Sequence, residues 1–202
     1  MQTLFHLVRH GQYGLIDRAL GGRAPGHALD AAGRDEAERV AEALRGRAVA
    51  AVVSSPVQRA RETAAPIAAA LGLAIRVDAG LVELDCGEWT GMTFETLRER
   101  PEWHRWNRFR SSAAIPGGES MLAAQARTVA ALERLHAEHG GQAAAEVVVV
   151  SHADIIKAAL LHVLGAPLDH MGRLEIAPGS RSVVAWHDES ARVLAANLPP
   201  GS

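Results

Sequence analysis

Cysteine and lysine are almost absent from this chain of 202 residues. Cys86 is the only cysteine, so neither an intramolecular disulfide nor a cluster of thiolates around a metal can form. Lys157 is the only lysine among 21 basic residues, and all the others are arginines. Because arginine is so common here, an arginine alone is weak evidence for an anion site, and each candidate must be argued from its position.

The sequence also lacks a strong net charge and a long apolar run. A formal net charge of −2 gives no electrostatic attraction to nucleic acid or to an anionic membrane. No uninterrupted apolar segment is long enough to cross a bilayer. The first residues show no basic segment followed by an apolar core and a cleavage site. These absences predict a cytoplasmic protein that binds neither nucleic acid nor a membrane.

Hydrophobic residues make up 48% of the chain, which is enough to fill the core of one domain over residues 1–202. Short apolar runs predict strands, and segments with apolar residues at helical spacing lie between them. This alternation predicts an α/β fold, a three-layer α/β/α sandwich with a mostly parallel central sheet of about six strands. The strands are expected near residues 3–8, 48–53, 74–77, 146–150, 174–176, 182–186 and 193–197.

Helix boundaries can also be expected from residue type. Asp30 is a typical N-cap for a helix that carries apolar residues up to Leu44. Ser55 can cap the next helix, with Pro56 at its first position and Gly72 at its end.

Arg9-His10-Gly11 follows the first predicted strand directly. His10 can attack an electrophile through a ring nitrogen, and Arg9 offers a planar set of donors for an oxyanion. Gly11 allows the backbone to turn close to a ligand. An isolated motif of this kind is more often a histidine that simply satisfies its hydrogen bonds at a strand end.

Three other polar residues occupy equivalent places beyond predicted strands. Arg59 lies in the first turn of a helix, Glu83 lies in a loop, and His152 follows the strand at 146–150. In a doubly wound sheet such positions converge on one crevice. With Arg9 and His10 they form a set suited to phosphoryl transfer, because arginines bind the non-bridging oxygens of a phosphoryl group.

Each of these residues also has an ordinary structural explanation. Arg59 could be a solvated helix residue, and His152 could hydrogen-bond a nearby loop. Glu83 could be a surface carboxylate, since Asp85 and Glu88 are close rivals for the same role.

The order and spacing of these residues make the chain similar to the histidine phosphatase superfamily, also called the phosphoglycerate-mutase-like family. The resemblance covers nearly the whole chain and rests on five motifs. They are Leu7-Val8-Arg9-His10-Gly11, the segment at 54–64 that contains Arg59, the segment at 83–91 that begins with Glu83, Pro116-Gly117-Gly118-Glu119-Ser120, and Val150-Ser151-His152.

The resemblance implies a role for each matched residue. His10 would accept the phosphoryl group, and Arg9, Arg59 and His152 would neutralise the phosphate and its transition state. Glu83 would act as general acid and then as general base. No metal and no cofactor is implied.

Substrate contacts are implied for Gln12, Gly22 and Ala153, in addition to Arg9 and Arg59. The chain departs from the family at two places. Ala153 stands where many members have glycine. The loop after Gly11 has Tyr13 where many members have threonine or serine, and residues 14–16 contain no asparagine.

A segment at about 89–116 is expected to form a lid over the leaving group, because it is short and contains Trp103, Trp106 and Phe109 among arginines. These aromatic residues could equally serve only to pack the segment onto the domain. The family's mutases carry a long insertion here, so the short segment favours hydrolysis.

The sequence therefore predicts a metal-independent phosphatase acting on a small phosphorylated metabolite of the sugar, glycerate or nucleoside phosphate type. The relatives it resembles are small bacterial phosphatases, and a homodimer is possible. A phosphoglycerate-type phosphomutase and a non-catalytic phospholigand-binding protein remain as alternatives.

Overall fold

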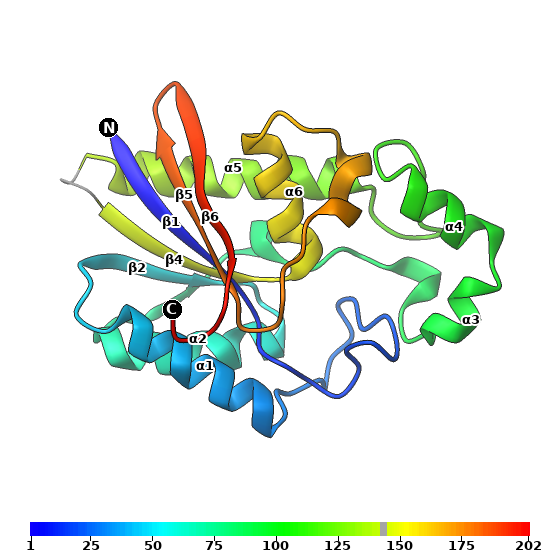
Figure 1. Ribbon diagram of the computed structural model, residues 1–202, viewed down its shortest axis with the longest axis horizontal. Helices are drawn as coiled ribbons and strands as arrows, with labels where there is room; N and C mark the ends of the chain where they lie inside the picture. Colours follow the sequence, from blue (N-terminus) through cyan, green and yellow to red (C-terminus); the bar gives the residue numbers. More distant parts are fainter. Residues whose placement is uncertain (142–144) are drawn as a thin grey trace.

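The computed structural model describes residues 1–141 and 145–202 and shows one six-stranded sheet between two layers of helices (Figure 1). The strand order is β3-β2-β4-β1-β5-β6. β1 and β2 both pair in parallel with β4, and β3 pairs in parallel with β2, whereas β5 and β6 are antiparallel to their neighbours. The strands are β1 (Gln2–Arg9), β2 (Val49–Ser54), β3 (Ile75–Val77), β4 (Ala145–Ser151), β5 (Arg181–His187) and β6 (Ser190–Leu198). The predicted three-layer sandwich is confirmed.

Side chains of β4 alternate between the two helical layers. Val148 and Val150 pack toward α1 (Ala31–Leu44) and α2 (Gln58–Leu71). Val147 and Val149 pack on the opposite face, toward α5 (Met121–His139) and α6 (Ala153–Val163). Both faces are buried, and this explains why β4 is a continuous run of valines.

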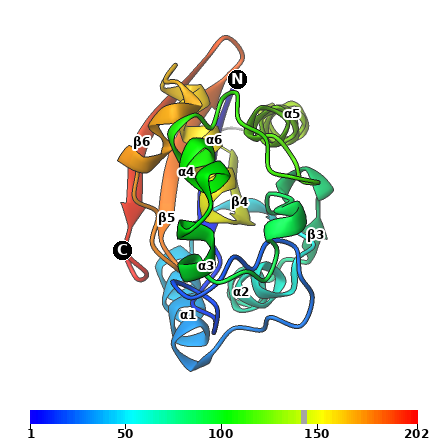
Figure 2. The same ribbon diagram turned by 90° about the vertical axis from the view of Figure 1, so that its right-hand side faces the viewer.

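A smaller unit extends beyond the carboxyl ends of the parallel strands, and Figure 2 shows it from that end. It contains α3 (Phe94–Arg98) and α4 (Pro101–Arg108), which are divided at Pro101 as the sequence predicts. Its buried side chains, together with residues of α5 and α6, form an apolar cluster that we call the lid core; it includes Trp89, Leu97 and Trp106. Trp106 is 1% exposed and packs edge-on against Trp89, with ring centroids 5.7 Å apart.

Short 3₁₀ turns complete the chain at η1 (Ala79–Leu81), η2 (Gly87–Trp89) and η3 (Leu168–Arg173). The strand expected at 174–176 is wrong, because that segment has no regular structure. Its backbone groups bond to side chains instead. The carbonyl of Ile176 accepts from Arg9, and the N–H of Ala177 donates to the side chain of Asn197.

The start of α2 also differs from the expectation. The helix begins at Gln58, and its N-cap is Val57, which makes no side-chain cap. Ser55 lies outside the helix, where its hydroxyl bonds to His152.

Within the described part of the chain, no helix combines the length and the apolar character that crossing a membrane requires.

Candidate active site

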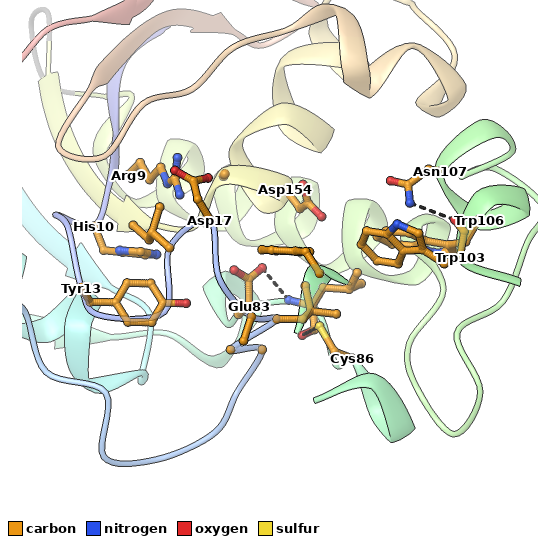
Figure 3. Close-up of a pocket in the computed structure, with 18 of the residues that line it drawn as sticks. Arg9, His10, Tyr13, Asp17, Glu83, Cys86, Trp103, Trp106, Asn107 and Asp154 are labelled. Atoms are coloured by element: carbon orange, nitrogen blue, oxygen red, sulfur yellow. Dashed lines mark hydrogen bonds between the residues drawn. The ribbon is translucent and has the colours of Figure 1, made fainter. Parts of the chain in front are cut away.

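A cavity of about 300 Å³ opens at the carboxyl ends of β1 and β4, between the loop that follows β1 and the lid (Figure 3). In Figure 3 Arg9, His10 and Asp17 lie at one end of the cavity, and Trp103, Trp106 and Asn107 lie at the other. Glu83 and Asp154 lie between the two ends. Open α/β sheets place their ligands at this edge.

His10 is fully buried at the end of β1, and its ring is held in one tautomer. Nδ1 lies 2.8 Å from the carbonyl oxygen of Gly11, so Nδ1 carries the proton and donates it. Nε2 accepts a hydrogen bond from Nε of Arg59 at 3.0 Å. Burial, together with the charges of Arg59 and Arg9, holds the pKa of His10 well below its usual range. The ring is therefore neutral near pH 7, with a lone pair on Nε2.

Arg59 lies at the centre of the site, in the first turn of α2, and is 1% exposed. Nη2 donates to the carbonyl of Gly22 at 2.9 Å and lies 3.3 Å from Nδ1 of His152. Nη1 is buried and has no partner among the described residues.

Arg9 has a similar unused donor. Nη1 of Arg9 donates to the carbonyl of Ile176 at 2.6 Å, whereas its buried Nε has no partner within the described chain. Unpartnered buried donors are costly in free energy. Arg9 lines the cavity, whereas Arg59 and His152 lie directly behind His10 and do not line it. Two unpartnered donors on neighbouring guanidinium groups indicate a binding site for an oxyanion next to His10.

His152 is the N-cap residue of α6 and lies against His10, with ring centroids 5.2 Å apart. Nε2 is 2.8 Å from the hydroxyl of Ser55. Burial, followed by the charge of Arg59, lowers the pKa of His152 well below its usual value. Because Arg59 donates toward Nδ1, Nε2 carries the proton and donates to Ser55.

Glu83 supplies the carboxylate of the site. Oε2 lies 3.5 Å from Nδ1 of His152 and 3.7 Å from Nη2 of Arg59. Burial raises the pKa of Glu83 to about 7, although Arg59 opposes this rise. A carboxyl group with this pKa exchanges a proton near neutral pH, as a general acid and base must.

The backbone of Glu83 is fixed by two arginines. Its carbonyl accepts from Nε of Arg23 at 2.7 Å and from Nη2 of Arg127 at 3.3 Å. Both arginines also bind the carboxylate of Glu119. Glu119 belongs to the predicted motif at 116–120. This motif therefore contributes to the site by holding the two arginines that keep Glu83 in position. The rivals Asp85 and Glu88 do not line the cavity.

Of the other predicted substrate contacts, Gly22 and Ala153 line the cavity. Gln12 does not, because its backbone faces α1, where its N–H donates to Glu36 at 2.8 Å. Contact between Gln12 and a substrate stays a prediction. Gly11 is required for a reason other than the one expected, since a Cβ there would overlap the carbonyl oxygen of Gly33 in α1.

The structure adds residues that the motifs did not indicate. Tyr13 packs under Arg59, whose Cζ lies 4.8 Å from the ring centroid, and edge-on against His10. Ser55 accepts a hydrogen bond from Nε2 of His152 and holds the orientation of its ring. Asp17 and Ile16 line the cavity in the loop that follows Gly11. Only the departure of this loop from the family pattern pointed to Tyr13 and Ile16.

The lid end of the cavity is formed mainly by α3 and α4. Trp103, Trp106, Asn107 and Arg110 line it together with Phe94. Arg110 lies flat on Trp106, with Cζ 3.5 Å from the ring centroid. Phe109, in contrast, is 44% exposed and does not line the cavity.

No group of three or more His, Cys, Asp or Glu side chains is arranged to hold a metal ion within residues 1–141 and 145–202. The cationic side chains that line the cavity are those of Arg9 and Arg110.

Comparison with known proteins fits this arrangement. The histidine phosphatase superfamily (branch 1) matches residues 5–199. The chain belongs to this superfamily. Relatives include phosphoserine phosphatase 1 of Hydrogenobacter thermophilus, which is 30% identical over 95% of this chain and 90% of its own length. Glucosyl-3-phosphoglycerate phosphatase of Mycobacterium tuberculosis is 33% identical over 80% of this chain and 75% of its own length.

Other relatives are longer. A bifunctional protein of Mycobacterium tuberculosis is 37% identical over 94% of this chain, but the chain spans only 52% of that protein. Among solved structures, the native mycobacterial glucosyl-3-phosphoglycerate phosphatase superposes with a TM-score of 0.89 at 27% identity. That match covers 98% of this chain and 100% of the other. The predicted family and fold are confirmed.

Proposed function

We propose that the protein is a phosphatase that hydrolyses a small phosphomonoester through a phosphohistidine on His10, without a metal. The observation that carries this proposal is the state of the two groups that react. His10 is neutral, with its Nε2 lone pair next to unpartnered arginine donors. Glu83 has a pKa of about 7 beside them. The phosphatases among the relatives support the same chemistry.

In the first step Nε of Arg59 releases its hydrogen bond to His10 and donates to the phosphoryl group instead. Nε2 of His10, now free, attacks phosphorus, and the bond from phosphorus to the leaving oxygen breaks. Arg9 and Arg59 stabilise the charge on the non-bridging oxygens. His152 helps to hold the guanidinium of Arg59 in place through its Nδ1. Glu83 gives its proton to the leaving oxygen, so the product leaves as a neutral alcohol. The Nδ1 proton of His10 stays on its bond to Gly11 throughout.

In the second step a water molecule attacks phosphorus from the side that the alcohol has left. The carboxylate of Glu83 takes the proton from that water, and the bond between phosphorus and Nε2 breaks. Inorganic phosphate is released, His10 returns to its neutral form and Glu83 is protonated again.

The experiment that tests this proposal is hydrolysis of p-nitrophenyl phosphate by the wild type and by His10→Ala, with EDTA present. Removal of a catalytic nucleophile is expected to lower kcat/KM by about 10⁴-fold or more. The exposed His162→Ala on α6 is the matched control and should retain wild-type activity. Equal activity of the wild type and His10→Ala, or loss of wild-type activity in EDTA, would overturn the proposal.

The two alternatives predict different results in the same preparation. A phosphomutase would convert a phosphoglycerate to its isomer and hold a phosphoenzyme that is stable for minutes. A binding protein would bind phosphate without turnover. Rapid formation of an acid-labile phosphoenzyme that breaks down to inorganic phosphate supports the phosphatase.

A cytoplasmic location and a homodimer are part of this proposal. The single, buried cysteine is compatible with a reducing compartment. Cell fractionation tests the first, and sedimentation of the purified protein tests the second.

A further inference from the structure

Tyr13 lies beside His10 at the phosphate end of the cavity and contacts both His10 and Arg59 (Figure 3). Cζ of Arg59 lies over the Tyr13 ring, 4.8 Å from its centroid, and the ring meets His10 edge-on at 5.3 Å between centroids. Tyr13 is only 7% exposed. A guanidinium over the face of an aromatic ring is attracted by the ring quadrupole, and the attraction is strongest where water is excluded.

The charge of Arg59 has no permanent anionic partner in the described part of the chain. Glu83 supplies the only carboxylate within 4 Å of it there, with Oε2 3.7 Å from Nη2. The pKa of Glu83 is about 7, and the proposed first step needs this carboxyl group protonated. A buried charge without a partner is costly. The face of the Tyr13 ring offers Arg59 a negative potential that does not depend on the protonation of Glu83.

One hydrogen bond of Arg59 has to change partner during the reaction. In the proposed first step Nε releases His10 and donates to the phosphoryl group. The contacts to Gly22 and His152 are both made by Nη2, so they hold the guanidinium at one corner. The Tyr13 ring contacts the central carbon, and this contact does not have to break when Nε changes partner.

The backbone at 21–22 accommodates both the ring and the guanidinium. A Cβ on Gly21 would lie 2.5 Å from the hydroxyl oxygen of Tyr13, although 3.4 Å from the ring carbon that bears it. The next residue, Gly22, accepts the hydrogen bond from Nη2 of Arg59. The absence of a side chain at Gly21 therefore leaves room for Tyr13 next to the carbonyl that holds Arg59.

We propose that the ring of Tyr13 positions Arg59, by keeping its guanidinium aligned with the phosphoryl group while Nε passes from His10 to the substrate. This inference rests on the proposed phosphatase activity. Tyr13 acts through Arg59, so it is a positioning residue, and the part of Tyr13 that matters is the aromatic face.

The test compares two substitutions of Tyr13. Tyr13→Leu keeps an apolar side chain and removes the aromatic face. We expect it to lower kcat/KM for p-nitrophenyl phosphate by about tenfold and to raise the Ki of inorganic phosphate by about the same factor. Tyr13→Phe keeps the ring and should restore both values to within about threefold of the wild type. Phe109→Leu is the control, because Phe109 pairs with Arg108 outside the cavity, and it should leave both values unaltered.

Gly21→Ala gives a second test that leaves Tyr13 in the chain. The backbone of Gly21 is outside the left-handed region, so alanine adds no strain there. Its methyl group would displace the hydroxyl of Tyr13 and tilt the ring, which should lower kcat/KM severalfold. The double variant Tyr13→Phe/Gly21→Ala lacks the displaced hydroxyl and should recover most of the lost activity.

Wild-type kcat/KM and Ki in Tyr13→Leu would overturn the inference. Equal losses in Tyr13→Leu and Tyr13→Phe would do so too, because the hydroxyl would then be the part that matters. A fall in kcat with unchanged KM and Ki would show loss of folded protein instead of a misplaced arginine, which also contradicts the inference. Calorimetric binding of inorganic phosphate to the same variants needs no turnover, so it separates these outcomes from failure of the phosphatase proposal.

Discussion

The two ends of the active-site cavity are built in different ways. The phosphate end consists of His10, Arg59 and His152, which are buried and attached to strand ends or to the first turn of a helix. The leaving-group end consists of the lid, whose short helices and connecting loops contribute Phe94, Trp103 and Asn107 to the cavity wall. Rigid attachment fixes the positions of the groups that bear charge in the transition state. Loop attachment leaves the other end free to differ between relatives.

Among the variants that test this difference between the two ends of the cavity, Arg59→Lys is expected to reduce activity the most. The guanidinium of Arg59 bonds to His10 and Gly22 at once and keeps Nη1 for the substrate, whereas an ammonium cannot reproduce this planar set of donors. We expect kcat/KM for p-nitrophenyl phosphate to fall by about 10³-fold. Arg61→Lys, an exposed change on the same helix, should have no effect. Near-normal activity of Arg59→Lys would show that the phosphate end does not need precisely placed donors, and it would contradict the proposed difference between the two ends.

A smaller effect, which depends on the substrate, is expected from Glu83→Gln. The first step needs Glu83 protonated, and its pKa is about 7, so wild-type kcat/KM for an alkyl phosphate should fall as pH rises above about 7. Glutamine removes this dependence and lowers the rate by about 10²-fold. In Glu83→Gln the rate of phosphoryl transfer to His10 should fall less for p-nitrophenyl phosphate than for an alkyl phosphate, because its leaving group needs no proton.

Glu88→Gln serves as the control for this variant, because Glu88 lies outside the cavity. An unchanged rate and pH profile in Glu83→Gln would show that Glu83 is not the general acid.

The smallest effect is expected from Ser55→Ala. The hydroxyl of Ser55 holds the orientation of the His152 ring and caps no helix, so its loss should lower kcat by about tenfold. It should also raise the pH at which activity is lost on the acid side, because His152 protonates more easily when it can turn toward Glu83. Ser54→Ala removes another buried hydroxyl bond in the same segment and is the control for stability. Equal loss of activity in both variants would mean that Ser55 acts only on folding.

The residues of the site differ in how far the sequence predicts them. His10, Arg9, Arg59, His152 and Glu83 could be assigned because each follows a recognisable strand or motif, and the sheet then brings them together. Asp17 could not, since its direction depends on the positive φ of one loop residue. Ser55 was interpreted as a helix cap because serine before proline fits that pattern, and the competing bond to a histidine 97 residues away leaves no local signal.

The same limit explains the error at 174–176. An apolar segment there suggested a strand, but long-range bonds from Arg9 and Asn197 occupy its backbone groups. Sequence patterns report local periodicity, and they miss bonds that a distant side chain makes to the main chain.

The lid core has a consequence for how this protein can diverge. Trp89, Trp106 and Leu97 are buried in a cluster separate from the two that cover the sheet. Substitutions at the lid surface can therefore be absorbed without disturbing the packing beneath His10 or Arg59. New substrates could be acquired by gene duplication and drift in this small unit, while the chemistry inherited on the sheet stays intact.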